Sequence, residues 1–225
     1  MFNTIPAFSI ISYFYSETNL NKMKNTLLLL LVVFGIGAAN AQDASKVFSN
    51  PTLVWFGVDF TQAKMVGMKD ESPHKIRDEY FKPWCDAVNN EIDLGKAFQK
   101  KGLVKVLAGV FKSNLTRETE TLSADDAKDL SAEAIAARVK GISTEQKKEG
   151  LAAVAIVQSF NKTTQEADVL IVFFDIATHN VLLTKKVTGK ASGGNTKTAF
   201  TAALKDVFSK IEKKEFATWK KDAHF

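Results

Sequence analysis

The chain of 225 residues carries 30 lysine and arginine residues against 25 aspartate and glutamate residues, a formal net charge of +5. This small excess is ordinary for a protein surface and does not indicate a nucleic-acid-binding face. The single cysteine excludes an intramolecular disulfide bond, so the fold must be stabilised by packing.

Residues 23–41 have the pattern of a bacterial secretory signal that begins at an internal methionine. Lys24 supplies the positive charge, residues 26–36 form an apolar run, and residues 39–41 (Ala-Asn-Ala) provide a small-x-small cleavage site. The apolar run is shorter than the ~20 residues needed to cross a bilayer core. We therefore expect a signal peptide cleaved after Ala41 and a periplasmic or secreted mature protein with no transmembrane segment.

Residues 1–22 carry a basic residue only at their very end, whereas a signal normally begins with its charged segment. Two interpretations stay open: translation starts at Met23 and the leader is dispensable, or it starts at Met1 and the leader is real. A lipid anchor requires a cysteine directly after the apolar run, and Cys85 lies far beyond it. The remaining residues, 42–225, have an even composition that predicts a single secreted domain.

The first strand and helix of this domain have clear patterns. Residues 52–60 are rich in β-branched and aromatic side chains and predict a buried strand. Ser72 and Pro73 are typical of a helix start. Pro83 falls inside the helical pattern and should kink the helix or split it near Phe81. The apolar stripe of this helix consists of Ile76, Tyr80, Phe81, Trp84, Cys85 and Val88.

The middle of the chain predicts two more strands and a helix. Residues 103–111 read as the second strand, and the polar residues 113–129 as a loop with some helical turns. Ser131 is typical of the N-cap of a helix that ends at Gly141. Residues 151–160, almost wholly apolar, predict a third strand.

The clearest pattern is a β-hairpin followed by a helix. Residues 167–176 and 181–187 are two β-rich runs joined by four residues, which predicts an antiparallel pair. Asn195 then caps a long helix whose apolar residues recur every three or four positions, a pattern that extends towards Trp219.

The order of these elements predicts an α/β or α+β sandwich. We expect a mixed sheet of about five strands with an antiparallel hairpin and a long C-terminal helix. Helices before and after three adjacent antiparallel strands favour a sheet covered mainly on one face. The apolar runs 151–157 and 169–174 nevertheless predict that the central strands are buried on both faces.

Three segments of the chain occur together in a known group of proteins. They are residues 55–60 (WFGVDF), 172–178 (VFFDIAT) and 189–194 (GKASGG). Together they resemble small, uncharacterised secreted proteins of Gram-negative bacteria, known mostly as domains of unknown function. The likeness spans about residues 52–208, and it implies secretion but no activity.

The C-terminal half has a looser similarity. Its succession of a strand, Asp-x-x-Thr, a strand, Gly-x-Ala and a helix is similar to periplasmic α/β lipoproteins that serve as envelope assembly factors. Examples are the curli secretion component and the activators of penicillin-binding proteins. The chain departs from them because it lacks the lipobox cysteine, so the resemblance does not imply a lipid anchor.

Two acidic residues lie at the ends of strand-like segments. A buried carboxylate is costly unless it is paired or hydrogen-bonded, so Asp59 and Asp175 are candidates for a catalytic or metal-binding pair. The alternative is structural: Asp175 opens the hairpin turn by accepting backbone N–H groups, and Asp59 ends its strand similarly. Alternation along the strand places Asp59 on the face of Trp55 and Gly57.

A glycine-rich loop precedes the last helix. Gly193, Gly194 and Asn195 lie where free N–H groups and the helix dipole can hold an anion, which makes them candidates for an anion site. The loop matches neither the phosphate-loop pattern nor Gly-x-Gly-x-x-Gly. The alternative is a plain strand-to-helix turn.

The remaining residue types indicate no cofactor and no metal. His74, His179 and His224 are not at ligand spacing, and His-Glu-x-x-His and Cys-x-x-Cys are absent from the sequence. Ser159 and Ser192 lack the Gly-x-Ser-x-Gly context of a serine hydrolase. Cys85, beside Trp84 in a predicted helix, reads as a small buried side chain, with a nucleophile or an intermolecular disulfide as alternatives.

The C-terminus combines lysines with aromatic residues and could rest on an anionic envelope surface. The alternative is a solvated helix end whose lysines complement the helix dipole. The candidate residues for surface binding are Lys213, Lys214, Phe216, Trp219, Lys220 and Lys221.

The leading hypothesis is an exported, non-enzymatic domain that acts in the bacterial envelope through contacts with an unidentified protein or surface. The first alternative is a hydrolase or small-ligand binder that uses Asp59 and Asp175. The second is a protein that binds an anionic surface through the C-terminus. The sequence does not predict the oligomeric state.

Overall fold

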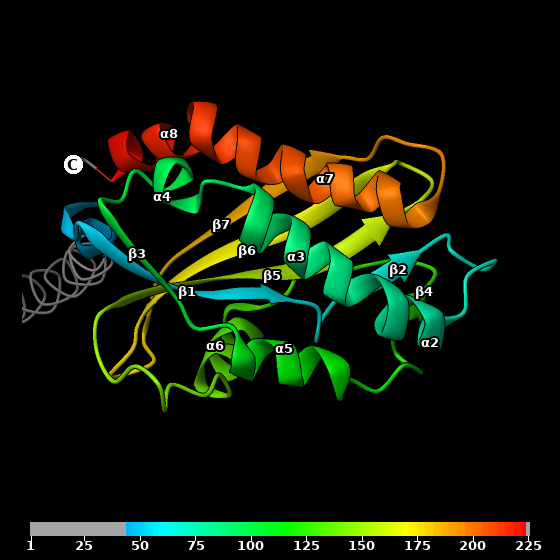
Figure 1. Ribbon diagram of the computed structural model, residues 1–225, viewed down its shortest axis with the longest axis horizontal. Coiled ribbons are helices and arrows are strands. Elements are labelled where there is room, and N and C mark those ends of the chain that lie inside the picture. The colour runs from blue at the N-terminus through cyan, green and yellow to red at the C-terminus, as the bar shows by residue number, and fades with distance from the viewer. Residues whose placement is uncertain (1–43, 224–225) are drawn as a thin grey trace, which may run out of the picture. The chain divides into compact units, whose positions relative to one another are not determined.

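The computed structural model describes residues 44–223 (Figure 1). The leader over residues 1–22 and the signal peptide over residues 23–41 lie outside the described residues. The described residues belong to one compact unit by their internal contacts. None of the helices described has the length and apolar character needed to cross a bilayer.

The centre of the fold is a mixed sheet built around β5 (Leu151–Asn161). One edge of β5 pairs along its whole length with antiparallel β6 (Glu166–Asp175), which in turn pairs with antiparallel β7 (Val181–Lys190). The other edge of β5 pairs in parallel with β1 (Thr52–Asp59) and then with β2 (Lys64–Val66).

Two short outer strands complete the sheet. β3 (Gly102–Lys105) lies parallel to β1, and β4 (Ser123–Ala124) lies parallel to β2. Seven strands thus occupy five positions across the sheet, because β1 with β2 and β3 with β4 follow one another end to end. The predicted mixed sheet, with its hairpin of β6 and β7, is confirmed.

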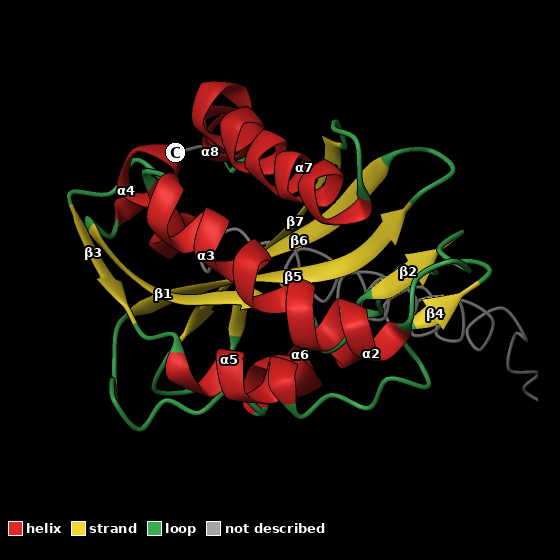
Figure 2. Ribbon diagram, turned by 45° about the vertical axis from the view of Figure 1, so that its right-hand side comes forward, coloured by secondary structure: helices red, strands yellow, loops and turns green. Residues whose placement is uncertain are grey.

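Helices cover both faces of this sheet (Figures 1 and 2). Alternate residues of β5 point in opposite directions: Ala153, Ala155 and Val157 belong to one core cluster, while Ala152, Val154 and Ile156 belong to the other. The first core lies under α3 (Phe81–Glu91), α4 (Leu94–Ala97) and the C-terminal helix. The second and smaller core lies under α5 (Ala108–Leu115) and α6 (Ala132–Lys140). The central strands are therefore buried on both faces, as predicted, whereas the expectation of a sheet covered mainly on one face is wrong.

The predicted second strand is wrong in its second half. Only Gly102–Lys105 are strand, whereas Ala108–Leu115 form α5. A short apolar run does not distinguish a strand from a buried helix by periodicity alone. Here Val110 and Asn114 are buried, and their spacing of four residues places both on the one face of the helix that is turned to the sheet.

The helix that begins at Pro73 changes geometry just before Pro83. α2 (Pro73–Lys75) continues into the π-helical turn η1 (Ile76–Tyr80), in which the Phe81 N–H donates to the Ile76 carbonyl, and the chain returns to α-helix in α3. Pro83 lacks the N–H that an α-helix needs, and its ring would press on the carbonyl four residues earlier. The wider turn just before it accommodates the ring, so the irregularity lies at Phe81, as predicted.

The C-terminal helix runs continuously through α7 (Thr196–Lys210), the π-helical turn η2 (Ile211–Glu215) and α8 (Phe216–Asp222). It crosses β7 at Gly189, where an added Cβ atom would lie 2.0 Å from the Ala203 carbonyl oxygen. A residue without a side chain is therefore required for the helix to approach the sheet this closely.

Candidate functional site

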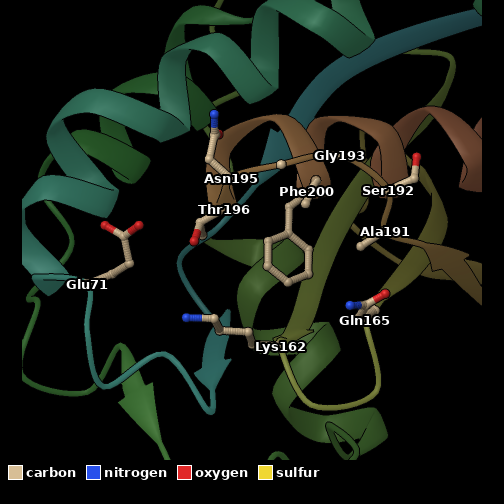
Figure 3. A pocket seen from close by; sticks show the side chains of 11 residues that line it. Glu71, Lys162, Gln165, Ala191, Ser192, Gly193, Asn195, Thr196 and Phe200 are labelled. Atoms are coloured by element: carbon tan, nitrogen blue, oxygen red, sulfur yellow. The ribbon is translucent and has the colours of Figure 1, made fainter.

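The candidate site is a pocket of about 280 Å³ at the start of α7, formed by three segments that are far apart in the sequence (Figure 3). One wall comes from the loop before α2, another from the turn between β5 and β6, and the third from the loop between β7 and α7. The lining residues are Glu71, Lys162, Gln165, Ala191, Ser192, Gly193, Gly194, Asn195, Thr196, Ala199 and Phe200.

Asn195 fixes the helix start at this pocket. Its side-chain oxygen accepts the Thr198 N–H at 2.9 Å, and the Thr198 hydroxyl oxygen accepts the Asn195 N–H at 3.4 Å. This reciprocal capping box satisfies the third N–H of the helix. The first N–H groups of any α-helix have no partner within it, so that of Thr196, which lines the pocket, remains available there. The predicted cap and the predicted candidates Gly193, Gly194 and Asn195 therefore lie together in a hollow.

The walls of the pocket carry both signs of charge. Lys162 forms an ion pair with Asp70 and holds the pKa of that carboxyl below its ordinary value. Glu71 accepts a hydrogen bond from the Tyr80 hydroxyl at 3.2 Å and pairs with Lys75 at 3.5 Å. In Figure 3 the ammonium end of Lys162 is directed towards the side on which Glu71 lies.

The floor of the pocket is aromatic. The Phe200 side chain is buried, with its ring centre 4.7 Å from that of Phe160 and 6.3 Å from that of Trp84. The apolar pattern of the last helix includes Phe200, but no sequence pattern indicated Glu71, Lys162 or Gln165. Those three are single polar residues in turns, and only the fold brings them beside the helix start.

Asp59 lies on the opposite face of β1 from the predicted one. The register of β1 against β5 shifts between Trp55 and Val58, and Gly57 adopts a positive φ of 105° within this bulge. A bulge inserts one residue into the alternation, so Val58 points to the same core as Trp55 while Asp59 faces α6.

The Asp59 carboxylate is fully buried and paired. It accepts a hydrogen bond from Arg138 Nε of α6 and another from the Thr61 N–H at 2.8 Å. Nearby, the buried Asn114 side chain bridges the Phe60 N–H at 2.7 Å and the Val58 carbonyl at 2.8 Å. These contacts hold the end of β1 to α5 and α6.

A second arginine completes this polar cluster. Arg117 donates to the Phe60 carbonyl and, at 3.4 Å, to the Thr121 carbonyl. Burial lowers the pKa of Arg117 to about 10. Sequence reasoning found Asp59 but missed Asn114, Arg117 and Arg138, because isolated polar residues in a loop or helix carry no pattern that predicts burial.

Asp175 has the structural role of the alternative interpretation. Its carboxylate accepts the Thr178 N–H and the Thr178 hydroxyl, both at 2.9 Å, and so closes the hairpin turn. Beside β5, Asp59 lies opposite Ile156 while Asp175 lies opposite Leu151. Five residues of strand separate them by roughly 16 Å, against the ~5 Å of a working carboxylate pair. The hypothesis of a catalytic pair is therefore corrected.

The C-terminal aromatics are core residues. Phe216 and Trp219 are only 2% and 4% exposed, and the Phe216 ring lies 5.4 Å from that of Phe48 and 6.1 Å from that of Phe98. One side of the helix faces the sheet, which buries these rings and leaves Lys213, Lys214 and Lys221 exposed. Buried to this extent, Phe216 and Trp219 are not placed to contact an envelope surface, as the surface-binding hypothesis requires of them.

The remaining candidates have structural partners. Burial raises the pKa of the Cys85 thiol to about 12, which keeps it protonated. His74 lies 3.3 Å from the Thr119 hydroxyl and His179 lies 3.1 Å from the Val139 carbonyl. Across residues 44–223, no three metal-ligating side chains of the His, Cys, Asp and Glu types come together. His224 lies outside the described residues.

Comparison with solved structures gives structural likenesses, among them the following two. No protein-family model and no curated protein matches the chain. The hypothetical protein CT253 from Chlamydia trachomatis is similar over 76% of this chain and 98% of its own, with 11% identity and a TM-score of 0.39. The C-terminal domain of LpoB from Salmonella enterica is similar over 67% of this chain and 94% of its own, with 8% identity and a TM-score of 0.23. The chain is thus structurally similar to one hypothetical bacterial protein and, loosely, to one LpoB domain.

Proposed function

We propose that this chain is an exported domain of the bacterial cell envelope that acts by binding another molecule rather than by covalent chemistry. Export is supported by the charged, apolar and small-x-small segments of residues 23–41. Binding is supported by the pocket at the start of α7, the observation that carries the proposal. The alternative candidates for chemistry have structural roles: Asp59 pairs with Arg138, Asp175 closes a turn, and the Cys85 thiol is protonated.

The chemistry of the pocket favours a small zwitterion, such as an amino acid or the carboxyl end of a short peptide. Lys162 and the Thr196 N–H group suit a carboxylate, while Glu71 suits an ammonium group. The Phe200 ring suits an apolar side chain between them. In the structure, Lys162 pairs with Asp70 at the surface, where 43% of the lysine side chain and 72% of the aspartate side chain are exposed. Such a pair is weak, so a ligand carboxylate can replace it.

The binding proposal is tested by titrating residues 42–225 with amino acids and dipeptides by calorimetry. We expect millimolar or tighter binding, weakened about tenfold by Lys162→Met or Glu71→Gln, since a charged hydrogen bond contributes about 1.5–3 kcal/mol. Lys205→Met is the matched control, because Lys205 is another surface lysine, paired with Glu91 at 2.5 Å away from the pocket. Absence of binding by every compound, or an equal loss in the control, contradicts the proposal.

The export proposal has a separate test. Expression in a Gram-negative host should yield a periplasmic or secreted protein whose N-terminus is Gln42, and Ala41→Phe should block its processing. A version that starts at Met23 should be exported equally well if translation begins there. N-terminal sequencing of the cell fractions measures both, and an unprocessed cytoplasmic product contradicts export.

A further inference from the structure

The outer strand β7 leaves part of its backbone edge open. β7 pairs only with β6 in the described sheet, and with ten residues it is much longer than the other outer strands, β3 and β4. Two backbone groups on the outer edge of β7 already have partners from α7. The Lys190 N–H donates to Asp206 at 2.9 Å, and the Thr188 carbonyl accepts Lys210 Nζ at 2.7 Å.

Nearer the start of β7, the backbone groups on the same edge have no backbone hydrogen-bond partner among the described residues. In an antiparallel strand, every second residue directs its N–H and C=O away from the paired neighbour. Because Lys190 and Thr188 direct theirs outward, Lys186 and Thr184 do so too. Apart from the pairing of β7 with β6, no backbone hydrogen bond of residues 44–223 involves these four atoms. Such an edge is a template for another strand.

A hollow lies directly beside this open edge. It has a volume of about 540 Å³ and is lined by Thr184, Val181 and Asn180 of the hairpin and by Ala132, Ile135 and Ala136 of α6. A strand added next to β7 would direct every second side chain to this face of the sheet, where small and apolar side chains form the walls. Apolar side chains at alternate positions of the added strand therefore fit the hollow.

The charged side chains of β7 indicate which kind of added strand fits this edge. β7 contains Lys185, Lys186 and Lys190 and no acidic residue. Lys186 is paired on the α6 face with Asp129 at 2.7 Å and Asp168 at 3.2 Å. Lys185 lies opposite Ile171 and so projects on the α7 face, where no carboxylate of the described chain pairs with it. A second copy of β7 would place lysines against lysines, which is unfavourable, whereas acidic side chains on the α7 face are complementary.

We propose that the open edge of β7 between Thr184 and Lys186 binds an extended segment of a partner protein by strand addition. The segment has apolar residues at alternate positions, which enter the hollow beside α6, and acidic residues between them, which face Lys185. Main-chain hydrogen bonds supply affinity and the two sets of side chains supply selectivity. This interaction is independent of the pocket at the start of α7.

The experiment uses two blocked eight-residue peptides, one alternating valine with glutamate and the other alternating valine with lysine. Affinity for residues 42–225 is measured by calorimetry, and exchange of the backbone amide hydrogens is followed by NMR. We expect the glutamate peptide to bind at least tenfold more tightly and to protect the Thr184 and Lys186 amides from exchange. Equal affinities, no binding, or unchanged exchange of these two amides overturns the proposal.

Two variants test the contacts separately. Thr184→Pro removes an outward N–H without removing a bond to β6, and proline is tolerated at such positions of edge strands. Lys185→Glu reverses the charge on the α7 face and does not depend on proline being accommodated. Each should weaken binding at least tenfold, whereas Lys205→Glu and the pocket variant Lys162→Met should not change it. Unchanged affinity in Lys185→Glu overturns the proposal, and so does unchanged affinity in a folded Thr184→Pro.

Discussion

Asp59 depends on its ion pair with Arg138 for its place in the core. Its side chain is fully buried and that of Arg138 is 11% exposed, so the pair is almost free of water. Removal of one partner leaves an uncompensated buried charge, which typically costs about 3–5 kcal/mol. We expect Arg138→Met to lower the free energy of unfolding by about that amount, measured by urea denaturation.

The double variant Asp59→Asn/Arg138→Met separates charge from packing. With both charges removed, the cavity is filled by neutral groups and the penalty of an unpaired carboxylate disappears. The double variant should therefore be more stable than Arg138→Met alone. A double variant that is equally or less stable contradicts this account of the pair.

Two glycines near the start of the C-terminal helix provide a matched comparison. A Cβ atom at Gly189 would lie 2.0 Å from the Ala203 carbonyl oxygen, whereas at Gly194 no heavy atom lies within 4 Å. Because α7 must move away from β7 to admit a methyl group, we expect Gly189→Ala to destabilise the fold by about 1–3 kcal/mol or more. Gly194→Ala should stay within about 0.5 kcal/mol of the parent. Thermal denaturation of both variants measures the difference, and similar melting temperatures would refute the close approach.

At the scale of elements, the C-terminal helix stabilises the fold through one side only. Phe216 is 2% exposed and contacts the rings of Phe48, Phe98 and Phe173, while Lys214 is exposed. Truncation of a buried phenylalanine to alanine typically costs about 3–5 kcal/mol. We expect Phe216→Ala to lose that much stability and Lys214→Ala to lose less than about 0.5 kcal/mol, both measured by urea denaturation. Comparable losses in the two variants would contradict the burial of this face.

The observed helices and strands also show which sequence patterns were sufficient to predict them. The β6–β7 hairpin and the capped C-terminal helix were predicted correctly, because strict local signals such as alternating β-rich runs and an Asn cap specify them. Residues 103–111 were predicted as one strand but divide into β3 and α5. There the local pattern is compatible with both structures, and packing of Val110 and Asn114 against the sheet decides between them.

At the scale of the molecule, the described residues form one unit with two cores on the faces of one sheet. Because both cores share β5 and β6, we expect residues 42–225 alone to unfold in a single cooperative transition. The three tryptophans, Trp55, Trp84 and Trp219, are all buried, so their fluorescence should shift to the red in that transition. The fluorescence and far-UV circular dichroism curves should coincide, and two separated transitions would show that the cores unfold independently.

The sequence by itself determined the class of the fold, the hairpin and the capped last helix, since each depends on residues close together in the chain. Only the tertiary structure decided which polar side chains lie together. A one-residue bulge at Gly57 turned Asp59 towards Arg138, and the sheet register held Asp59 and Asp175 at a distance from each other. The pocket at the start of α7 likewise joins residues from three segments that are far apart in the sequence. Strand and helix patterns report which side chains are buried locally, whereas pairing, register and pockets depend on contacts between distant residues, which no local pattern encodes.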